Sequence, residues 1–355
     1  MQKLIEALSK EPARLKLVLM PVTRLLIESP VTIGKYHIFP PEYVSLAELR
    51  PVPNATLSSG QGDGLISLSG QTLREVKTSI TGFGLDVLSE SPLIGFVTEI
   101  NWTEFLSSDH EHDRQLLHEC VRNANRAFDI LRFDHCRLDI PATLPGRIGS
   151  WLEMPGFIGA MIYTLEDHES YLIACESDCP TSVTKGIGLD LFGYEVDDIP
   201  DASDGEVSSI AIHALSLFAE VLEAGSETVK FVRAMTLLEF LATPDGFRSW
   251  KKLKGDIVCH VAHDKADYHR RCQRFAELTS SESPSGEQTG LRTLVVHHGR
   301  YLEEIVPEGS NRALLFRELQ EFISGVLSDM LDRPTMSWIQ FCEYRLTMKK
   351  AMGVA

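Results

Sequence analysis

Residues 207–242 read VSSIAIHALSLFAEVLEAGSETVKFVRAMTLLEFLA, and this stretch decides how the second half of the chain folds. Its apolar residues recur every three or four positions, which is the spacing of one buried face of an α-helix. Gly225 divides the stretch and Pro244–Gly246 ends it, because glycine and proline are poor helix formers. We therefore predict two helices, at residues 207–223 and 227–242.

The helical pattern continues towards the end of the chain. Further helices are expected at 247–262, 264–280, 289–298, 311–331 and 336–349, with Pro334 between the last two. The Ser-, Pro- and Gly-rich segment 280–290 is interpreted as a connection before the helix at 289–298. Residues 195–206, EVDDIPDASDGE, are acidic and carry Pro, Gly and Ser, so we place a domain boundary there. Residues 207–355 are thus predicted to form an all-α domain.

The first 200 residues mix strand and helix patterns. Short runs rich in β-branched or aromatic residues are strand candidates, at 15–20, 25–27, 31–39, 93–102, 151–153, 157–164 and 171–175. Residues 110–132 have helical spacing instead. The predicted fold class is therefore α+β, with a strand-rich mixed α/β domain over residues 1–200 followed by the helical domain.

The composition is that of an ordinary globular protein. Hydrophobic residues make up 43% of the 355 positions, and no run approaches the eighteen or so apolar residues that a membrane span needs. The N-terminus lacks the apolar stretch of a secretory signal, and the seven cysteines are odd in number and scattered. We therefore expect a cytoplasmic protein with reduced thiols, no membrane partner, no metal site and no cofactor.

The charge is unevenly distributed along the chain. The net charge is −16, which argues against a protein that coats nucleic acid, yet residues 246–300 carry ten Lys/Arg against six Asp/Glu. A local basic region can guide a polyanion to one place, although a solvated helical face has the same composition. The residues that we predict to contact RNA are Lys251, Lys252, Lys254, Arg270 and Arg271.

The segment TGLRTLVVHHGR, residues 289–300, carries the strongest candidate for chemistry. Gly299 is a natural helix C-cap, so His297 and His298 fall in the last turn, where histidine can exchange protons near neutral pH. Arg292 is always charged and can bind phosphate with two parallel hydrogen bonds. On a regular helix, positions five apart are offset by about 140°. Arg292 and His297 are therefore expected to converge only at a helix end, or through a second copy of the chain.

This motif resembles the Arg-x4–6-His signature of HEPN domains. The ending Val-Val-His-His-Gly is similar to that of the Apea-like subgroup, and LLEFLAT, residues 237–243, resembles the early helix of such domains. The resemblance covers roughly residues 208–335. In the family the residue after the Arg is often Asn or another polar residue, and here it is Thr293.

The resemblance implies a helical bundle that cleaves RNA without metal as a symmetric dimer. His297 would be the general base or acid for attack by the ribose 2′-hydroxyl, and Arg292 would stabilise charge on the phosphate. His298 would orient the substrate or share the proton transfer, and Glu239 is a weaker candidate that faces the same cleft. Such fusions belong to antiviral or toxin-like systems, with the N-terminal domain as a sensor or regulator of a viral or protein trigger.

Two other interpretations remain open at this point. The same helices suit a non-catalytic dimerisation and binding module. His110, Glu111, His112 and Asp113 are a possible metal cluster, which we rank below an ordinary solvated helix start. His260 and His263 belong either to an RNA-contacting face or to the core. A Ser nucleophile elbow is absent from the sequence.

Overall fold

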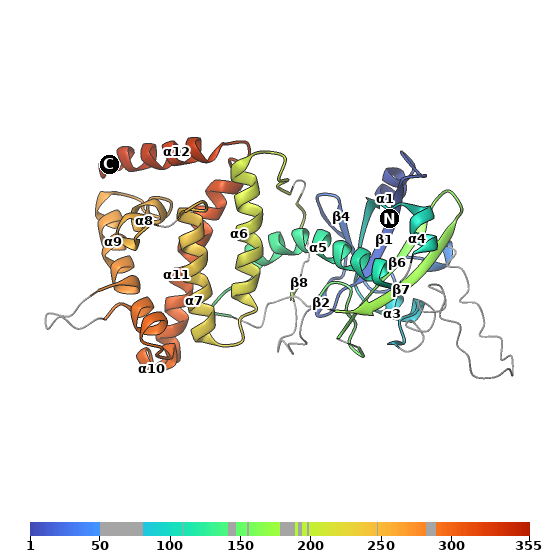
Figure 1. Cartoon of the computed structure of the whole chain (residues 1–355), viewed down its shortest axis with the longest axis horizontal. Helices are drawn as coiled ribbons and strands as arrows, with labels where there is room; N and C mark the ends of the chain where they lie inside the picture. The colour runs from blue at the N-terminus through green and yellow to red at the C-terminus, as the bar shows by residue number, and fades with distance from the viewer. Residues whose placement is uncertain are drawn as a thin grey trace. The chain divides into compact units, whose positions relative to one another are not determined.

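The computed structural model describes residues 1–49, 81–108, 110–140, 147–154, 156–177, 189–190, 194–196, 199–246, 248–281 and 289–355. It contains helices and an antiparallel sheet, so the predicted α+β class is confirmed (Figure 1). The chain divides into two compact units, one of residues 1–128 with 145–199 and one of residues 129–144 with 200–355. None of the described helices is long and apolar enough to cross a membrane.

The first unit is built on a six-stranded sheet in which every pair of neighbours is antiparallel. The strand order is β3-β4-β5-β1-β6-β7. The strands are β1 (Leu15–Pro21), β3 (Val31–Ile33), β4 (Tyr36–Phe39), β5 (Leu93–Glu99), β6 (Phe157–Thr164) and β7 (Glu169–Glu176). Separately, β2 (Leu25–Leu26) pairs in parallel with β8 (Leu189–Asp190).

Both faces of the central strand β1 are buried. Leu17 and Leu19 pack in one core cluster with Leu4 and Leu8 of α1 (Gln2–Leu8). Val18 points to the opposite face, because side chains alternate along a strand, and it is also fully buried. The sheet is therefore covered on both sides. The other elements of this unit are η1 (Leu46–Leu49), α3 (Leu85–Glu90), α4 (Trp102–Ser107) and most of α5 (His110–His135).

Three strand predictions were wrong in part. Residues 31–39 form a hairpin rather than one strand, because Gly34, at a φ of 56°, turns the chain between β3 and β4. The strand expected at 93–102 ends at Glu99, since Asn101 caps α4 by accepting a hydrogen bond from the Glu104 amide. Residues 151–153 form no strand, although Trp151 is buried.

The described elements of the second unit are helices. The predicted helices at 207–223 and 227–242 are confirmed within a residue as α6 (Glu206–Leu222) and α7 (Glu227–Ala242). The later ones are α8 (Trp250–Val258), α9 (Lys265–Thr279), the π-helical turn η3 (Thr293–His297), α10 (Leu302–Ile305), α11 (Gly309–Leu331) and α12 (Trp338–Ala351). Helix α7 packs against α6, α8 and α11. Residues 282–288 of the predicted connection lie outside the described residues.

The residues that follow α5 are held by side chains of α7 and α11. Gln320 accepts a hydrogen bond from the Leu138 amide and donates one to the Cys136 carbonyl, both at 2.8 Å. The buried ammonium group of Lys230 donates to the Leu138 carbonyl at 3.1 Å. The carboxylate of Asp139 pairs with Arg317 at 3.1 Å. This connector, residues 136–140, is therefore part of the helical unit, although the predicted boundary lay near residue 200.

A buried hydrogen-bond network fixes α12 to the bundle. Arg345 is 2% exposed and donates hydrogen bonds to the carbonyls of Leu241 and Ala242 at the end of α7, at 2.8 and 3.2 Å. It also donates to His260 Nε2 at 3.0 Å, while His260 Nδ1 lies 2.6 Å from the Asp329 carboxylate. Arg345 can donate only to an unprotonated Nε2, and burial lowers the pKa of His260, which favours this neutral form of the ring. His260 therefore belongs to the core, whereas His263 is exposed.

Candidate functional site

The segment that carries Arg292 and His297 is not a regular α-helix. Only residues 291 and 292 are α-helical, and the chain then forms the π-helical turn η3. In this turn the His298 amide donates a hydrogen bond to the Thr293 carbonyl at 3.3 Å. In such a turn the hydrogen bonds join residues five apart, so a residue and the fifth after it lie close to one face. The segment is therefore not the regular helix that was expected at 289–298, and a π-helical turn makes the angular offset between positions five apart smaller than on an α-helix.

Glycine residues bound this turn on both sides. Gly299 has a φ of 66° and ends the turn, as its C-cap role predicts. Gly290 lies against the end of α9, where its amide donates to the Ser281 carbonyl at 3.1 Å. The hydroxyl of Thr293 donates to the Thr279 carbonyl at 2.9 Å, and Val295 is buried. Thr293, the departure from the family pattern, thus fastens the motif to α9.

Arg292 is held by two other helices of the unit. Its guanidinium lies over the Trp250 ring, 5.5 Å from the centroid, and its Nη2 is 3.7 Å from Glu239 Oε2. The latter distance is too long for a hydrogen bond, so this ion pair is loose. Trp250 is supported from the core, because its ring packs 5.6 Å from that of the buried Phe275. Helices α7 and α8 therefore position the side chain of the residue that directly precedes η3.

The hydrogen-bond donors of Arg292 remain available for a ligand. Its side chain is only 24% exposed, yet it makes no hydrogen bond to any residue that the structure describes. Arg271, Arg274 and Arg333 differ, since each donates to a carboxylate at 3.0 Å or less. A half-buried guanidinium with unused donors is well suited to bind an anion such as a phosphate.

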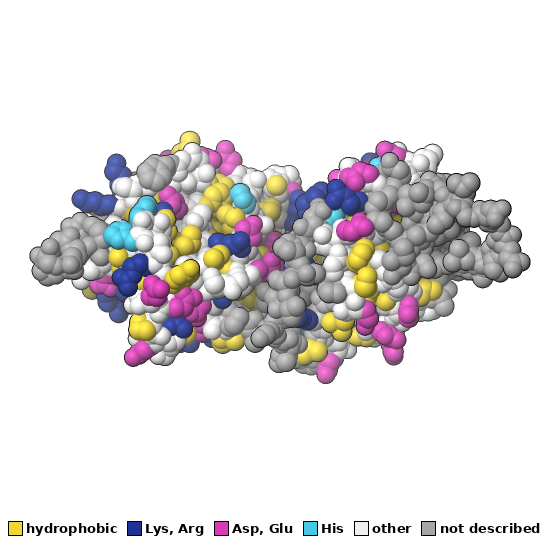
Figure 2. Space-filling view, turned by 60° about the horizontal axis from the view of Figure 1, so that its bottom comes forward, with side chains coloured by type: hydrophobic (Ala, Val, Ile, Leu, Met, Phe, Trp, Pro, Cys, Tyr) yellow, Lys and Arg dark blue, Asp and Glu magenta, His cyan; other side chains and the backbone are white. Residues whose placement is uncertain are grey.

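The two candidate histidines lie at the surface. His297 and His298 are both exposed, and neither ring makes a hydrogen bond within the described ranges. Figure 2 shows histidine side chains close to Lys and Arg side chains on the surface of the helical unit. The geometry thus joins an oriented cation, Arg292, with an accessible proton-exchanging group five residues later. It does not place His297 in direct contact with Glu239.

The predicted RNA-contacting residues divide into two groups. Lys251 and Lys252 are exposed and directly follow Trp250 at the start of α8, with Lys254 half-buried further along. On α9 the carboxylate of Asp267 pairs with both Arg270 and Arg271, and Arg271 also pairs with Glu321 at 2.8 Å. Among these five residues, Lys251 and Lys252 are therefore the exposed cations that directly follow Trp250, the residue under the Arg292 guanidinium. Sequence reasoning missed Trp250, although an aromatic residue before two lysines was a usable signal.

The alternative metal cluster finds no support in the described residues. No group of three or more His, Cys, Asp or Glu side chains among them is arranged to hold a metal ion. Asp113 is buried and lies 3.3 Å from the hydroxyl of Ser108, and the side chain of His110 lies outside the described residues.

No protein-family model, curated protein or solved structure matches this chain.

Gly290→Ala is expected to damage the site and lower stability. An added Cβ would lie 2.6 Å from both the Thr279 carbonyl oxygen and the Ser280 amide nitrogen. Both are backbone atoms, which cannot move away by a change of rotamer. Overpacking of this kind costs about 1–3 kcal/mol. Urea unfolding followed by circular dichroism measures the loss. Gly225→Ala is the matched control, since its Cβ meets nothing within 4 Å, and an equal loss in both variants would contradict this interpretation.

Proposed function

We propose that this protein is a metal-independent endoribonuclease of the HEPN type. The observation that carries the proposal is Arg292, a half-buried guanidinium with unused donors that directly precedes the π-helical turn ending at the exposed His297. Cleavage of RNA by its own 2′-hydroxyl needs a base, an acid and a cation for the phosphoryl oxygens. This segment supplies such a cation and a group able to transfer protons.

Each residue has a definite role in the proposed reaction. His297 removes the proton from the 2′-hydroxyl or returns one to the departing 5′-oxygen, and His298 shares that transfer. Arg292 donates to the non-bridging phosphoryl oxygens. Glu239 and Trp250 are positioning residues, because they contact Arg292 and keep its guanidinium in place before the substrate binds. No cofactor is required.

A second copy of the chain would complete the site. One copy offers a single Arg292, and its two histidines are adjacent, so a second copy would supply a second arginine and a separate pair of histidines across the substrate. Three exposed apolar side chains support such an interface: Val296, which is next to His297, Val229 and Tyr301. The segments that carry Val229 and Tyr301 lie side by side, because the Leu302 amide donates a hydrogen bond to Thr228 Oγ1. We further propose that the N-terminal unit regulates this activity in the cytoplasm, in response to a viral or protein trigger, in an antiviral or toxin-like role.

The decisive experiment is cleavage of single-stranded RNA by the purified full-length protein in EDTA. His297→Ala should slow cleavage about 10²–10⁴-fold, since it removes a general acid–base group. Arg292→Ala should slow it about 10²–10³-fold, since it removes the cation that stabilises the transition state. Both variants should keep the wild-type circular dichroism spectrum.

His263→Ala is the matched control, because His263 is another exposed histidine of the helical unit. It should cleave at the wild-type rate. If wild type and His297→Ala release equal amounts of cleaved RNA, the ribonuclease proposal fails and a non-catalytic binding module takes its place. Full cleavage activity of a monomer would overturn the two-copy site but not the ribonuclease proposal.

A further inference from the structure

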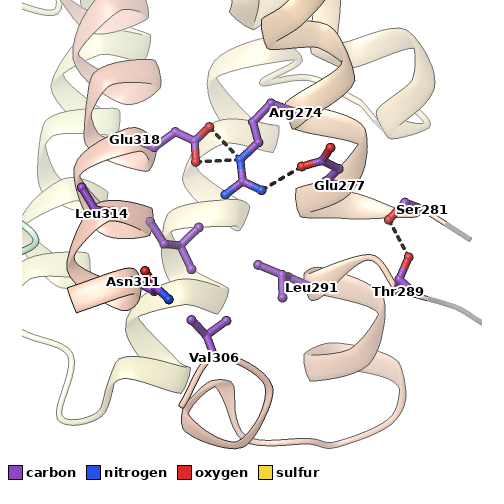
Figure 3. Close-up of a pocket in the computed structure, with 10 residues that line it drawn as sticks. Arg274, Glu277, Ser281, Thr289, Leu291, Val306, Asn311, Leu314 and Glu318 are labelled. Carbon is purple, nitrogen blue, oxygen red and sulfur yellow. Dashed lines mark hydrogen bonds and ion pairs between the residues drawn. The ribbon is translucent and has the colours of Figure 1, made fainter. Parts of the chain in front are cut away.

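A cavity of about 470 Å³ lies behind the reactive turn, between α9, α11 and the segment from η3 to α10 (Figure 3). Leu291 lines it, and the next residue is Arg292, which contacts α7 and α8 instead. The volume falls in the range of small-molecule sites, about 300–1,000 Å³. The cavity is therefore distinct from the site formed by Arg292, Trp250 and Glu239, although the same short segment contributes to both.

The walls of the cavity are aliphatic. The aliphatic lining residues come from three segments: Leu291 from just before η3, Val306 from just after α10, and Leu314 and Leu315 from α11. Leu314 is 57% exposed, so this wall is open to solvent at one side. A planar apolar ring would gain contact with these side chains from more than one direction.

One edge of the cavity is polar and contains groups of both signs. Arg274 Nε lies 3.0 and 3.1 Å from the two carboxylate oxygens of Glu318, and its Nη1 donates to Glu277 at 2.9 Å. No hydrogen bond from Arg274 Nη2 is formed with the described residues. Figure 3 shows the guanidinium between the two carboxylates, on the side of the cavity opposite Val306. Asn311, whose amide donates to Glu308 at 3.1 Å, contributes a second polar group.

This set of groups selects the chemistry of a ligand. Two carboxylates against one guanidinium disfavour an anion in the cavity itself. The same set suits a neutral ring that has adjacent donors on one edge and adjacent acceptors on another. Guanine has this pattern: its N1–H and N2–H groups match a carboxylate, and its O6 and N7 atoms match a guanidinium. Adenine lacks the paired donors.

We propose that this cavity is a guanine-binding site, with Glu318 and Glu277 as acceptors, Arg274 as donor and the leucines as walls. The guanine could belong to a nucleotide of the RNA substrate or to a free guanine nucleotide. The connection through Leu291 to Arg292 favours an RNA nucleotide near the cleaved bond, and only this part of the inference rests on the proposed ribonuclease function.

The test is calorimetric titration of the full-length protein with guanosine, adenosine and cytidine. Guanosine should bind saturably and about tenfold or more tightly than adenosine, in line with the discrimination given by one good bidentate contact. Glu318→Gln should weaken guanosine binding about tenfold. Leu314→Trp should abolish it by filling the cavity. Ile339→Trp is the matched control, since Ile339 is 72% exposed on α12 and lines no part of the cavity.

The outcomes separate this inference from the proposed function. No saturable guanosine binding, equal binding of adenosine, or full binding by Leu314→Trp overturns the guanine site. Guanosine binding without RNA cleavage supports the site and counts against the ribonuclease. When both are seen, cleavage next to guanine that is lost in Leu314→Trp assigns the site to RNA, and tighter binding of guanosine monophosphate without sequence preference assigns it to a free nucleotide.

Discussion

Arg345→Met is expected to lower the free energy of unfolding of the helical unit by about 3–5 kcal/mol, because three buried acceptors lose their donor and each such loss costs about 1–3 kcal/mol. Arg345 donates to the last two carbonyls of α7 and to His260, and its guanidinium lies 4.8 Å from the Phe341 ring. Methionine keeps the apolar stem but supplies none of these donors. The α7 carbonyls have no further helical partner, so they would lose their hydrogen bonds in the core.

Urea unfolding followed at 222 nm measures this loss, since helices dominate that signal. Lys350→Met is the matched control: Lys350 is an exposed cation on the same helix, and its replacement should change stability by less than about 0.5 kcal/mol. A loss below about 1 kcal/mol for Arg345→Met would show that α12 contributes little to the bundle.

Gln320→Leu is expected to cost about 2–4 kcal/mol, because each buried polar group left without a partner costs about 1–3 kcal/mol. The amide of Gln320 bonds both the Leu138 amide and the Cys136 carbonyl, so one substitution removes partners from two backbone groups. Leucine has a similar volume and fits the partly buried position of Gln320 on α11. The connector should then exchange its amide hydrogens faster than α7 does.

Hydrogen exchange at the Leu138 amide is the most direct readout, together with urea unfolding. Gln320→Glu is an informative second variant, since it keeps the acceptor for the Leu138 amide but sets a charged acceptor against the Cys136 carbonyl. Exchange at Leu138 should therefore stay closer to the wild-type rate in Gln320→Glu than in Gln320→Leu. Unchanged exchange at Leu138 in the leucine variant would mean that Lys230 and Arg317 hold the connector without Gln320.

Local signals predicted the helices of the second unit well. Helices α6 and α7 have bounds within a residue of those expected, because Gly205 and Ser226 precede them and Gly225 and Pro244 follow close after each. Long-range contacts explain what was missed. The connector 136–140 has no local pattern, since α7 and α11 hold it across about a hundred residues or more of sequence.

The sequence pointed to Arg292 and His297 as candidates but did not give the geometry of the segment that carries them. Regular helix geometry offsets positions five apart, so the two were expected to converge only at a helix end or through a second copy. The turn is π-helical instead, with Gly290 pressed against α9 and Thr293 bonded to it, and neither contact is visible in a local pattern. Trp250 and the cavity beside Leu291 were missed for the same reason, because they depend on how α8, α9 and α11 pack.

The connector also bears on how this protein can be recombined. Because residues 129–144 belong to the helical unit, the gene encodes that unit as two pieces, and the 55 codons of residues 145–199, which belong to the other unit, lie between them. Recombination between these two pieces would give a helical unit without the connector residues that Lys230 and Gln320 bind. The two units are therefore expected to be inherited together, and exchange of the N-terminal unit would succeed only when it leaves the end of α5 in place.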